Sequence, residues 1–215
     1  MISRGAKPLP ENAFVPSPEH ASPSLSMRIE QRQAPRYTLL LRQAKLRTRY
    51  GEFLCIIRDV SASGISIRIF HPLPPCRRMA IELRDGSPYL VEKIWERAGE
   101  AGFRFRDPVA LAQMLEDDSR YPRRPIRVAI DVPVTVTSGE QRGTGFLTNL
   151  SQQGARLDAD CSWARGQLLR IAADDMPMAY AKVRWRRDHV HGLVLEETFS
   201  FRDFARCLGR LHGLV

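Results

Sequence analysis

The sequence has few cysteines and no two of them lie close together. Cys55, Cys76, Cys161 and Cys207 are spread along the chain without a Cys-x-x-Cys motif. A disulfide framework or a zinc knuckle needs clustered cysteines, so neither is expected. No run of 18 apolar residues occurs, and the first ten residues (MISRGAKPLP) are not followed by the apolar core of a signal peptide. We therefore expect a cytoplasmic protein without a membrane span.

Lysine is also scarce. Of 33 basic residues four are lysine, which leaves 29 arginines, and with 24 acidic residues the formal net charge is +9. This excess favours an anionic partner, which could be nucleic acid, an acidic membrane surface or a small phosphate-bearing ligand. The flat fork of arginine suits paired hydrogen bonds to phosphate and guanine. A GC-rich genome also produces many arginines, so charge alone leaves these classes open.

The sequence contains no arrangement typical of an enzyme. It has no nucleophile–base arrangement, no P-loop and no pair of carboxylates placed for acid–base chemistry. His189 and His191 alternate along one segment without a third ligand, which does not indicate a metal site. We expect a protein that is not an enzyme and needs no metal or cofactor.

Two halves of the chain repeat each other. A spacing of 90 residues relates Asp59 to Asn149, Ser61 to Ser151, Gly64 to Gly154, Trp95 to Trp185 and Gly102 to Gly192, and a spacing of 91 relates Arg32 to Arg123 and Arg36 to Arg127. A chain of 215 residues suits two domains of about 100 residues each. We predict a disordered leader at 1–27, rich in Pro and Ser, a first domain at 28–118 and a second at 119–215.

Each half is typical of about six short antiparallel strands followed by a helix. Six twisted strands can protect their edges by curling into a barrel. The first helix is expected in the segment DPVALAQMLEDD, with Asp107 as N-cap and Pro108 in the first turn. The second is expected at 199–211, where apolar residues recur at helical spacing. The sequence predicts a mainly all-β protein of two tandem six-stranded antiparallel barrels, each with a C-terminal helix.

Each half also carries two arginines four residues apart and, after two predicted strands, a polar turn. RQAPR at 32–36 precedes DVSASG at 59–64, and RRPIR at 123–127 precedes NLSQQG at 149–154. One arginine pair means little in so arginine-rich a chain, but the same order appears twice. The combination resembles the PilZ domain, a bacterial receptor module for the second messenger cyclic di-GMP. The resemblance implies an arginine loop that folds over the ligand against the polar turn.

The residue types of the two motifs suit this ligand, which has two phosphates and two guanines. An arginine can bind phosphate or guanine O6 and N7, and a carboxylate at Asp59 can accept from the N1–H and N2–H₂ donors of guanine. Asn149 has one acceptor oxygen, so we expect a weaker second site. The serines donate to phosphate or brace the turn, and the glycines allow close backbone approach. The predicted cyclic di-GMP ligands are Arg32, Arg36, Asp59, Ser61, Gly64, Arg123, Arg127, Asn149, Ser151 and Gly154.

The predicted function is a receptor that changes loop order or domain orientation on binding and regulates an unidentified protein partner in motility, exopolysaccharide or biofilm output. One alternative is a tandem barrel that binds nucleic acid, which we do not expect because exposed aromatic clusters are few. A second is an interaction adaptor with degenerate sites, since Gln31 and Pro122 replace the basic residue often found before the arginine pair. Trp95 and Trp185 are expected to pack in the core or at the barrel mouth.

Overall fold

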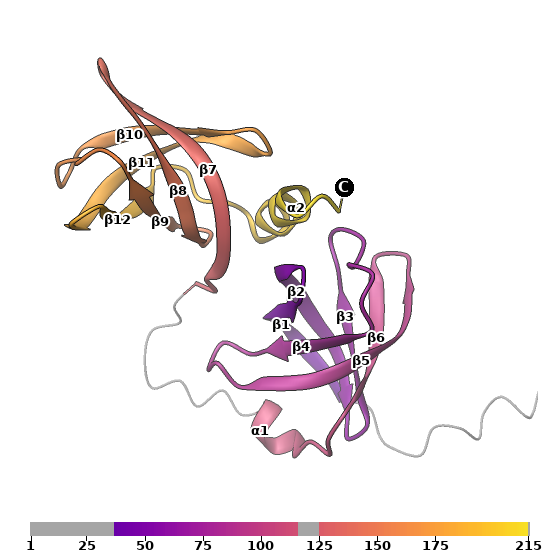
Figure 1. Ribbon diagram of the computed structural model, residues 1–215. Coiled ribbons are helices and arrows are strands. Elements are labelled where there is room, and N and C mark those ends of the chain that lie inside the picture. The colour runs from indigo at the N-terminus through magenta and orange to yellow at the C-terminus, as the bar shows by residue number, and fades with distance from the viewer. Residues whose placement is uncertain (1–36, 116–124, 215) are drawn as a thin grey trace, which may run out of the picture. The chain divides into compact units, whose positions relative to one another are not determined.

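The computed structural model describes residues 37–115 and 125–214 (Figure 1). In these two ranges the chain forms two closed barrels, each of six antiparallel strands. The prediction of a mainly β protein with two tandem six-stranded barrels is confirmed. The predicted leader at 1–27 and the predicted boundary between 118 and 119 lie outside the described residues.

The N-terminal barrel is built from consecutive hairpins and one crossover. Its order is β1-β2-β3-β6-β5-β4, and β1 pairs with β4, through Leu46 opposite Ile81, to close the sheet. The strands are β1 (Tyr37–Thr48), β2 (Gly51–Ser61), β3 (Gly64–Arg68), β4 (Arg78–Glu82), β5 (Pro88–Arg97) and β6 (Glu100–Phe105).

Alternation in the short strands shows how one face of the sheet comes to enclose the core. In β3, Ile65 and Ile67 are buried, whereas Ser66 is half-buried and Arg68 is exposed. Burial of each isoleucine contributes roughly 1.5–3 kcal/mol. The same alternation leaves every second side chain of a strand on the outer wall, where a ligand can reach it.

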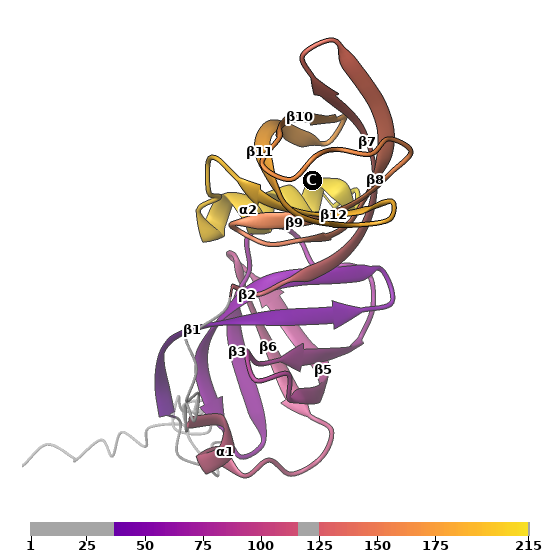
Figure 2. The ribbon, with the colours of Figure 1, turned by 90° about the vertical axis from the view of Figure 1, so that its left-hand side faces the viewer.

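The C-terminal barrel repeats the same topology. Its order is β10-β11-β12-β9-β8-β7, closed by pairing of β10 with β7, and the β7–β8 hairpin is seen side-on in Figure 2. This identical order confirms the internal repeat inferred from the sequence. The strands are β7 (Val128–Ser138), β8 (Gln141–Leu150), β9 (Gly154–Ala159), β10 (Leu168–Ala173), β11 (Met176–Arg187) and β12 (Val190–Leu195).

The helix that follows the C-terminal barrel lies where it was predicted. Helix α2 (Phe201–Leu211) begins after Ser200, whose hydroxyl oxygen accepts a hydrogen bond from the backbone N–H of Asp203 at 3.1 Å. Phe204 and Leu208 are fully buried in the hydrophobic cluster of this barrel. The helical spacing of apolar residues therefore marked the face of the helix that packs in the core.

The first helix differs from the prediction at its start. Helix α1 (Leu111–Leu115) begins four residues after Asp107, so Asp107 is not its N-cap. The chain is still held to the sheet just before this point, because the N–H of Arg106 donates to the carbonyl of Leu90 in β5 at 2.9 Å. The predicted continuation to Asp118 lies outside the described residues.

The cysteines are all free. Cys55 and Cys207 are buried, and burial raises the pKa of the Cys55 thiol to about 12, which keeps it protonated. In the part of the chain that the structure describes, neither helix is long and apolar enough to cross a membrane.

Candidate functional site

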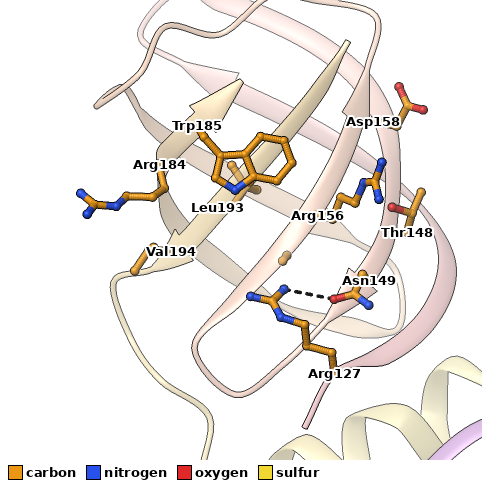
Figure 3. Close-up of a pocket in the computed structure, with 11 residues that line it drawn as sticks. Arg127, Thr148, Asn149, Arg156, Asp158, Arg184, Trp185, Leu193 and Val194 are labelled. Atoms are coloured by element: carbon orange, nitrogen blue, oxygen red, sulfur yellow. Dashed lines mark hydrogen bonds between the residues drawn. The ribbon is translucent and has the colours of Figure 1, made fainter. Parts of the chain in front are cut away.

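A pocket lies on the outer wall of the C-terminal barrel (Figure 3). It has a volume of about 620 Å³ and is lined by side chains of β8, β9, β11, β12 and the segment that leads into β7. The lining residues are Arg127, Thr148, Asn149, Ala155, Arg156, Asp158, Arg184, Trp185, Gly192, Leu193 and Val194.

Two predicted ligand residues meet in this pocket. The guanidinium of Arg127 donates to Oδ1 of Asn149 at 3.2 Å, the contact dashed in Figure 3. Asn149 lies near the end of β8, where the register shifts against both neighbouring strands, between Ala129 and Val132 and between Leu147 and Asn149. Such irregularities bend a strand and re-aim its side chains. They bring the amide of Asn149 to the arginine that precedes β7.

The other two predicted residues of this motif hold the turn itself. Ser151 is 1% exposed, and its hydroxyl donates to the carbonyl of Gly154 at 3.0 Å, beside the backbone N–H of Ser151 at 2.8 Å. A Cβ on Gly154 would come within 2.3 Å of the carbonyl oxygen of Leu193, so the position has room only for glycine. Neither residue lines the pocket. They fix the turn that places Asn149.

The N-terminal barrel carries a smaller pocket at the corresponding place. Its volume is about 270 Å³, and its lining includes Asp59, Ser61, Gly64 and Trp95. The carboxylate of Asp59 accepts a hydrogen bond from the hydroxyl of Ser66 at 2.9 Å. The structure thus brings together all three predicted residues of the first polar turn.

This turn is closed in the same way as its counterpart. The Ser61 hydroxyl donates to the carbonyl of Gly64 and accepts from its N–H, each at 3.2 Å, and a Cβ on Gly64 would approach the Phe103 carbonyl oxygen to 2.6 Å. Arg32 and Arg36 of the first motif and Arg123 of the second lie outside the described residues.

Both pockets contain a tryptophan that rests on a glycine. A Cβ on Gly102 would lie 2.1 Å from Nε1 of Trp95, and one on Gly192 would lie 2.0 Å from Nε1 of Trp185. The pairs are adjacent in the β5–β6 and β11–β12 registers. Trp185 is 47% exposed. The prediction that the tryptophans pack in the core or at the barrel mouth is therefore wrong: each ring packs against a strand on the outer wall and lines a pocket.

Three charged residues of the larger pocket were not among the predicted ligands. Arg156 and Asp158 extend outward from β9, and Arg184 precedes Trp185 in β11. The alternation of the segment GARLDA could have found the first two, since it puts 156 and 158 on the outer face beside the turn. Arg184 could not be found in this way, because it comes from a strand about 30 residues further along.

The groups that line the pockets are suited to hydrogen bonding and ring stacking. Each offers hydrogen-bonding groups and a flat ring, and the larger one offers several guanidinium groups. Among residues 37–115 and 125–214, no three histidine, cysteine or carboxylate side chains are grouped so as to hold a metal ion. Tandem closed barrels with such pockets on their walls define a class of β-barrel modules that can hold a small anionic ligand with a planar ring.

Comparison with known families gives this class a name. The PilZ domain profile matches residues 30–116 and again residues 117–208, which together make up most of the chain. The protein belongs to the PilZ domain family, and it contains two PilZ domains in tandem.

Several solved structures show low similarity to the chain. The PlzA protein of Borreliella burgdorferi, in complex with c-di-GMP, is 12% identical, with a TM-score of 0.33, over 80% of this chain and 88% of that one. The Bacillus subtilis inhibitor of motility, MotI/DgrA, is 13% identical, with a TM-score of 0.34, over 80% and 97%. YcgR of Escherichia coli, in complex with c-di-GMP, is 10% identical, with a TM-score of 0.31, over 80% and 84%. No curated protein sequence matches the chain.

Proposed function

We propose that this protein is a cytoplasmic, non-enzymatic receptor for cyclic di-GMP that binds the nucleotide on the outer wall of its barrels. The strongest support is one juxtaposition: Arg127, held by Asn149, shares a pocket of about 620 Å³ with Arg156, Arg184 and the exposed ring of Trp185. Membership of the PilZ family supports the same conclusion.

The larger pocket matches the ligand group by group. Two phosphates need cationic donors, and guanidinium forks can bind phosphate oxygens or guanine O6 and N7 with paired hydrogen bonds. The face of Trp185 offers a stacking surface for a guanine, a contact worth about 1–3 kcal/mol per base in other proteins. The amide of Asn149 can exchange hydrogen bonds with the edge of the same base.

The smaller pocket matches part of the same ligand. One carboxylate oxygen of Asp59 is engaged by Ser66, and the carboxylate faces a wall formed by Trp95 and Gly102. A carboxylate can accept from both N1–H and N2–H₂ of guanine. We propose that Arg32 and Arg36 complete this site and that Arg123 completes the other, as the family resemblance implies.

We further propose that binding changes the order of the arginine segments or the orientation of the two domains. The change would alter contacts with a protein partner that controls motility, exopolysaccharide synthesis or biofilm formation. This step is motivated by the position of Arg127, which immediately precedes β7 and is tied to Asn149 in the pocket. Small-angle scattering with and without ligand tests it, and an unchanged profile at saturation would contradict it.

The direct test is calorimetric titration of the full chain with cyclic di-GMP at moderate ionic strength. GMP is the matched control, since it carries the same base and one phosphate monoester but cannot span the pocket. Saturable heat with cyclic di-GMP, with much weaker binding of GMP, is expected. If neither heat nor a shift in melting temperature is seen, the receptor function is wrong. Tight, steeply salt-dependent binding of single-stranded DNA would instead favour the nucleic-acid alternative.

A further inference from the structure

The two pockets differ most on their walls, although their turns are similar. Positions 90 residues apart occupy equivalent places: Ser66 and Arg156 both pair with the glycine that supports the tryptophan, and Ile94 and Arg184 both precede that tryptophan. A neutral pair in the N-terminal barrel thus corresponds to two cations in the C-terminal barrel.

The C-terminal wall carries two guanidinium groups and one carboxylate. Within the described parts of the chain, neither Arg156 nor Arg184 takes part in an ion pair, and Asp158 is the one carboxylate among the lining residues. Figure 3 shows Arg156 on the same side of the pocket as Asn149, and Arg184 beyond Trp185 at the opposite edge, with its side chain extended outward. Two uncompensated cations on either side of a ring suit a ligand with two separated negative charges.

The polar groups of the N-terminal wall already have protein partners. Ser66 donates to Asp59 at 2.9 Å, and Arg104 pairs with Glu92 at 3.2 Å. The ring of Trp95 is approached by the guanidinium of Arg97, 5.2 Å from the ring centroid. A ligand would have to compete with these contacts, which lowers the net gain from each new one.

The tryptophan ring of the C-terminal pocket, Trp185, differs from Trp95 in this respect. Trp185 is 47% exposed, and no cation–π contact to it occurs among the described residues. Among the described residues, the C-terminal pocket therefore offers two cations without an ion pair and a ring without a cation–π contact.

We propose that Arg156 and Arg184 make the C-terminal pocket the tighter of two cyclic di-GMP sites, so that the protein fills stepwise and the C-terminal barrel fills first. This ranking rests on the proposed function. It reverses the order that the single acceptor oxygen of Asn149 predicts, because two charge-assisted contacts to phosphate, each worth about ten-fold or more in affinity, outweigh the one charge-assisted contact that a carboxylate in place of Asn149 would add. The receptor would then have distinct states at low and high nucleotide concentration.

Replacement of the two C-terminal wall arginines by their N-terminal counterparts tests this ranking. One variant carries Arg156→Ser with Arg184→Ile, which installs the N-terminal residues in the C-terminal wall. The matched control is Arg142→Ile with Arg165→Ser, which removes the same two charges from exposed positions of the same barrel outside the pocket. Calorimetry on the full chain is expected to show the tighter step weakened by about ten-fold or more per arginine in the first variant and unchanged in the control.

Tryptophan fluorescence assigns each step to a barrel. The intensity change at the lower cyclic di-GMP concentration is expected to disappear in Trp185→Phe and to persist in Trp95→Phe. The third tryptophan, Trp163, is fully buried and serves as a constant background.

The outcomes separate this inference from the proposed function. If the tighter step survives Arg156→Ser with Arg184→Ile and is lost in Asp59→Ala, the ranking is wrong although the protein remains a receptor. A single binding step that is lost in the wall variant supports the ranking, and one that is lost only in Asp59→Ala overturns it. If the unaltered protein binds no cyclic di-GMP, the receptor function itself fails.

Discussion

The indole ring of Trp185 lies so close to Gly192 that a Cβ on the glycine would come within 2.0 Å of the ring nitrogen. The same contact joins Trp95 and Gly102 in the other barrel, at 2.1 Å. The two positions of each pair are seven residues apart in the sequence and neighbours across a hairpin. This contact explains why tryptophan and glycine recur together at a spacing of 90, and it fixes the ring on the outer wall.

The tight contact predicts that mutations at these two positions have coupled effects on the free energy of unfolding. Gly192→Ala should lower the free energy of unfolding by about 1–3 kcal/mol, because the added methyl displaces the ring. In a Trp185→Ala background the same change should cost much less, since the obstructing ring is gone. Urea denaturation of the four proteins of this double-mutant cycle measures the coupling. Equal costs in both backgrounds would contradict the packing described.

Arg127 is expected to contribute to binding and little to stability. Its side chain is exposed and contacts Asn149, so Arg127→Ala should leave the free energy of unfolding within about 0.5 kcal/mol of the unaltered value. Loss of one charge-assisted contact should weaken cyclic di-GMP binding by about ten-fold or more. Arg127→Lys should restore only part of the affinity, because an ammonium cannot form the bidentate fork. A similar loss in Arg165→Ala would show that general charge, and not this position, is responsible.

Ser151, unlike Arg127, is expected to contribute to stability and little to binding. Its hydroxyl is buried and donates to the Gly154 carbonyl, so Ser151→Ala should destabilise the protein by about 0.5–1.5 kcal/mol. The backbone N–H of Ser151 donates to the same carbonyl and should keep the turn intact. Chemical denaturation and calorimetry on one variant separate the two effects. Unchanged stability combined with a large loss of affinity would mean that the hydroxyl contacts the ligand directly.

The buried ring of His191 predicts a pH-dependent stability. Its Nε2 accepts from the backbone N–H of Trp163 at 3.2 Å, and burial lowers its pKa below the ordinary value of about 6.5. The unfolded chain takes up the proton first as the pH falls. The contribution of the neutral ring is therefore complete above about pH 6.5 and is lost as the pH falls through the folded-state pKa.

Urea midpoints between pH 7.5 and pH 5 measure this effect. The decline toward low pH should be shallower in His191→Gln than in the unaltered protein. His189→Gln changes an exposed histidine two residues away and should leave the decline as it was. An identical pH dependence in His191→Gln would rule out this histidine as a source.

The sequence predicted the fold well because strand alternation is a local signal and the repeat is visible when the chain is compared with itself. Ile65 and Ile67 mark a buried face without any knowledge of their neighbours, and the 90-residue spacing shows that the same unit occurs twice. The start of helix α1 was misjudged, because the local N-cap signal of Asp107 and Pro108 does not mark the first helical residue, Leu111.

The pockets were predicted only in part, since their walls come from strands that are distant in sequence. Asp59 and Asn149 were found through their turns, whereas Arg184 reaches the site only through the pairing of β11 with β12 and β12 with β9. Burial, which no motif reveals, distinguishes Ser151, whose hydroxyl is hydrogen-bonded within the turn, from the residues that line the pocket.

Closure of each sheet bears on how a duplicated domain can be tolerated in one chain. In an open sheet, the edge strands would present unpaired backbone groups, and the nearest partner for such an edge would be the corresponding strand of the second copy. Here β1 is joined to β4 and β7 to β10, so neither sheet leaves an open edge for strand exchange with the other copy. Each copy can then diverge by itself, as serine at 66 and arginine at 156 already have.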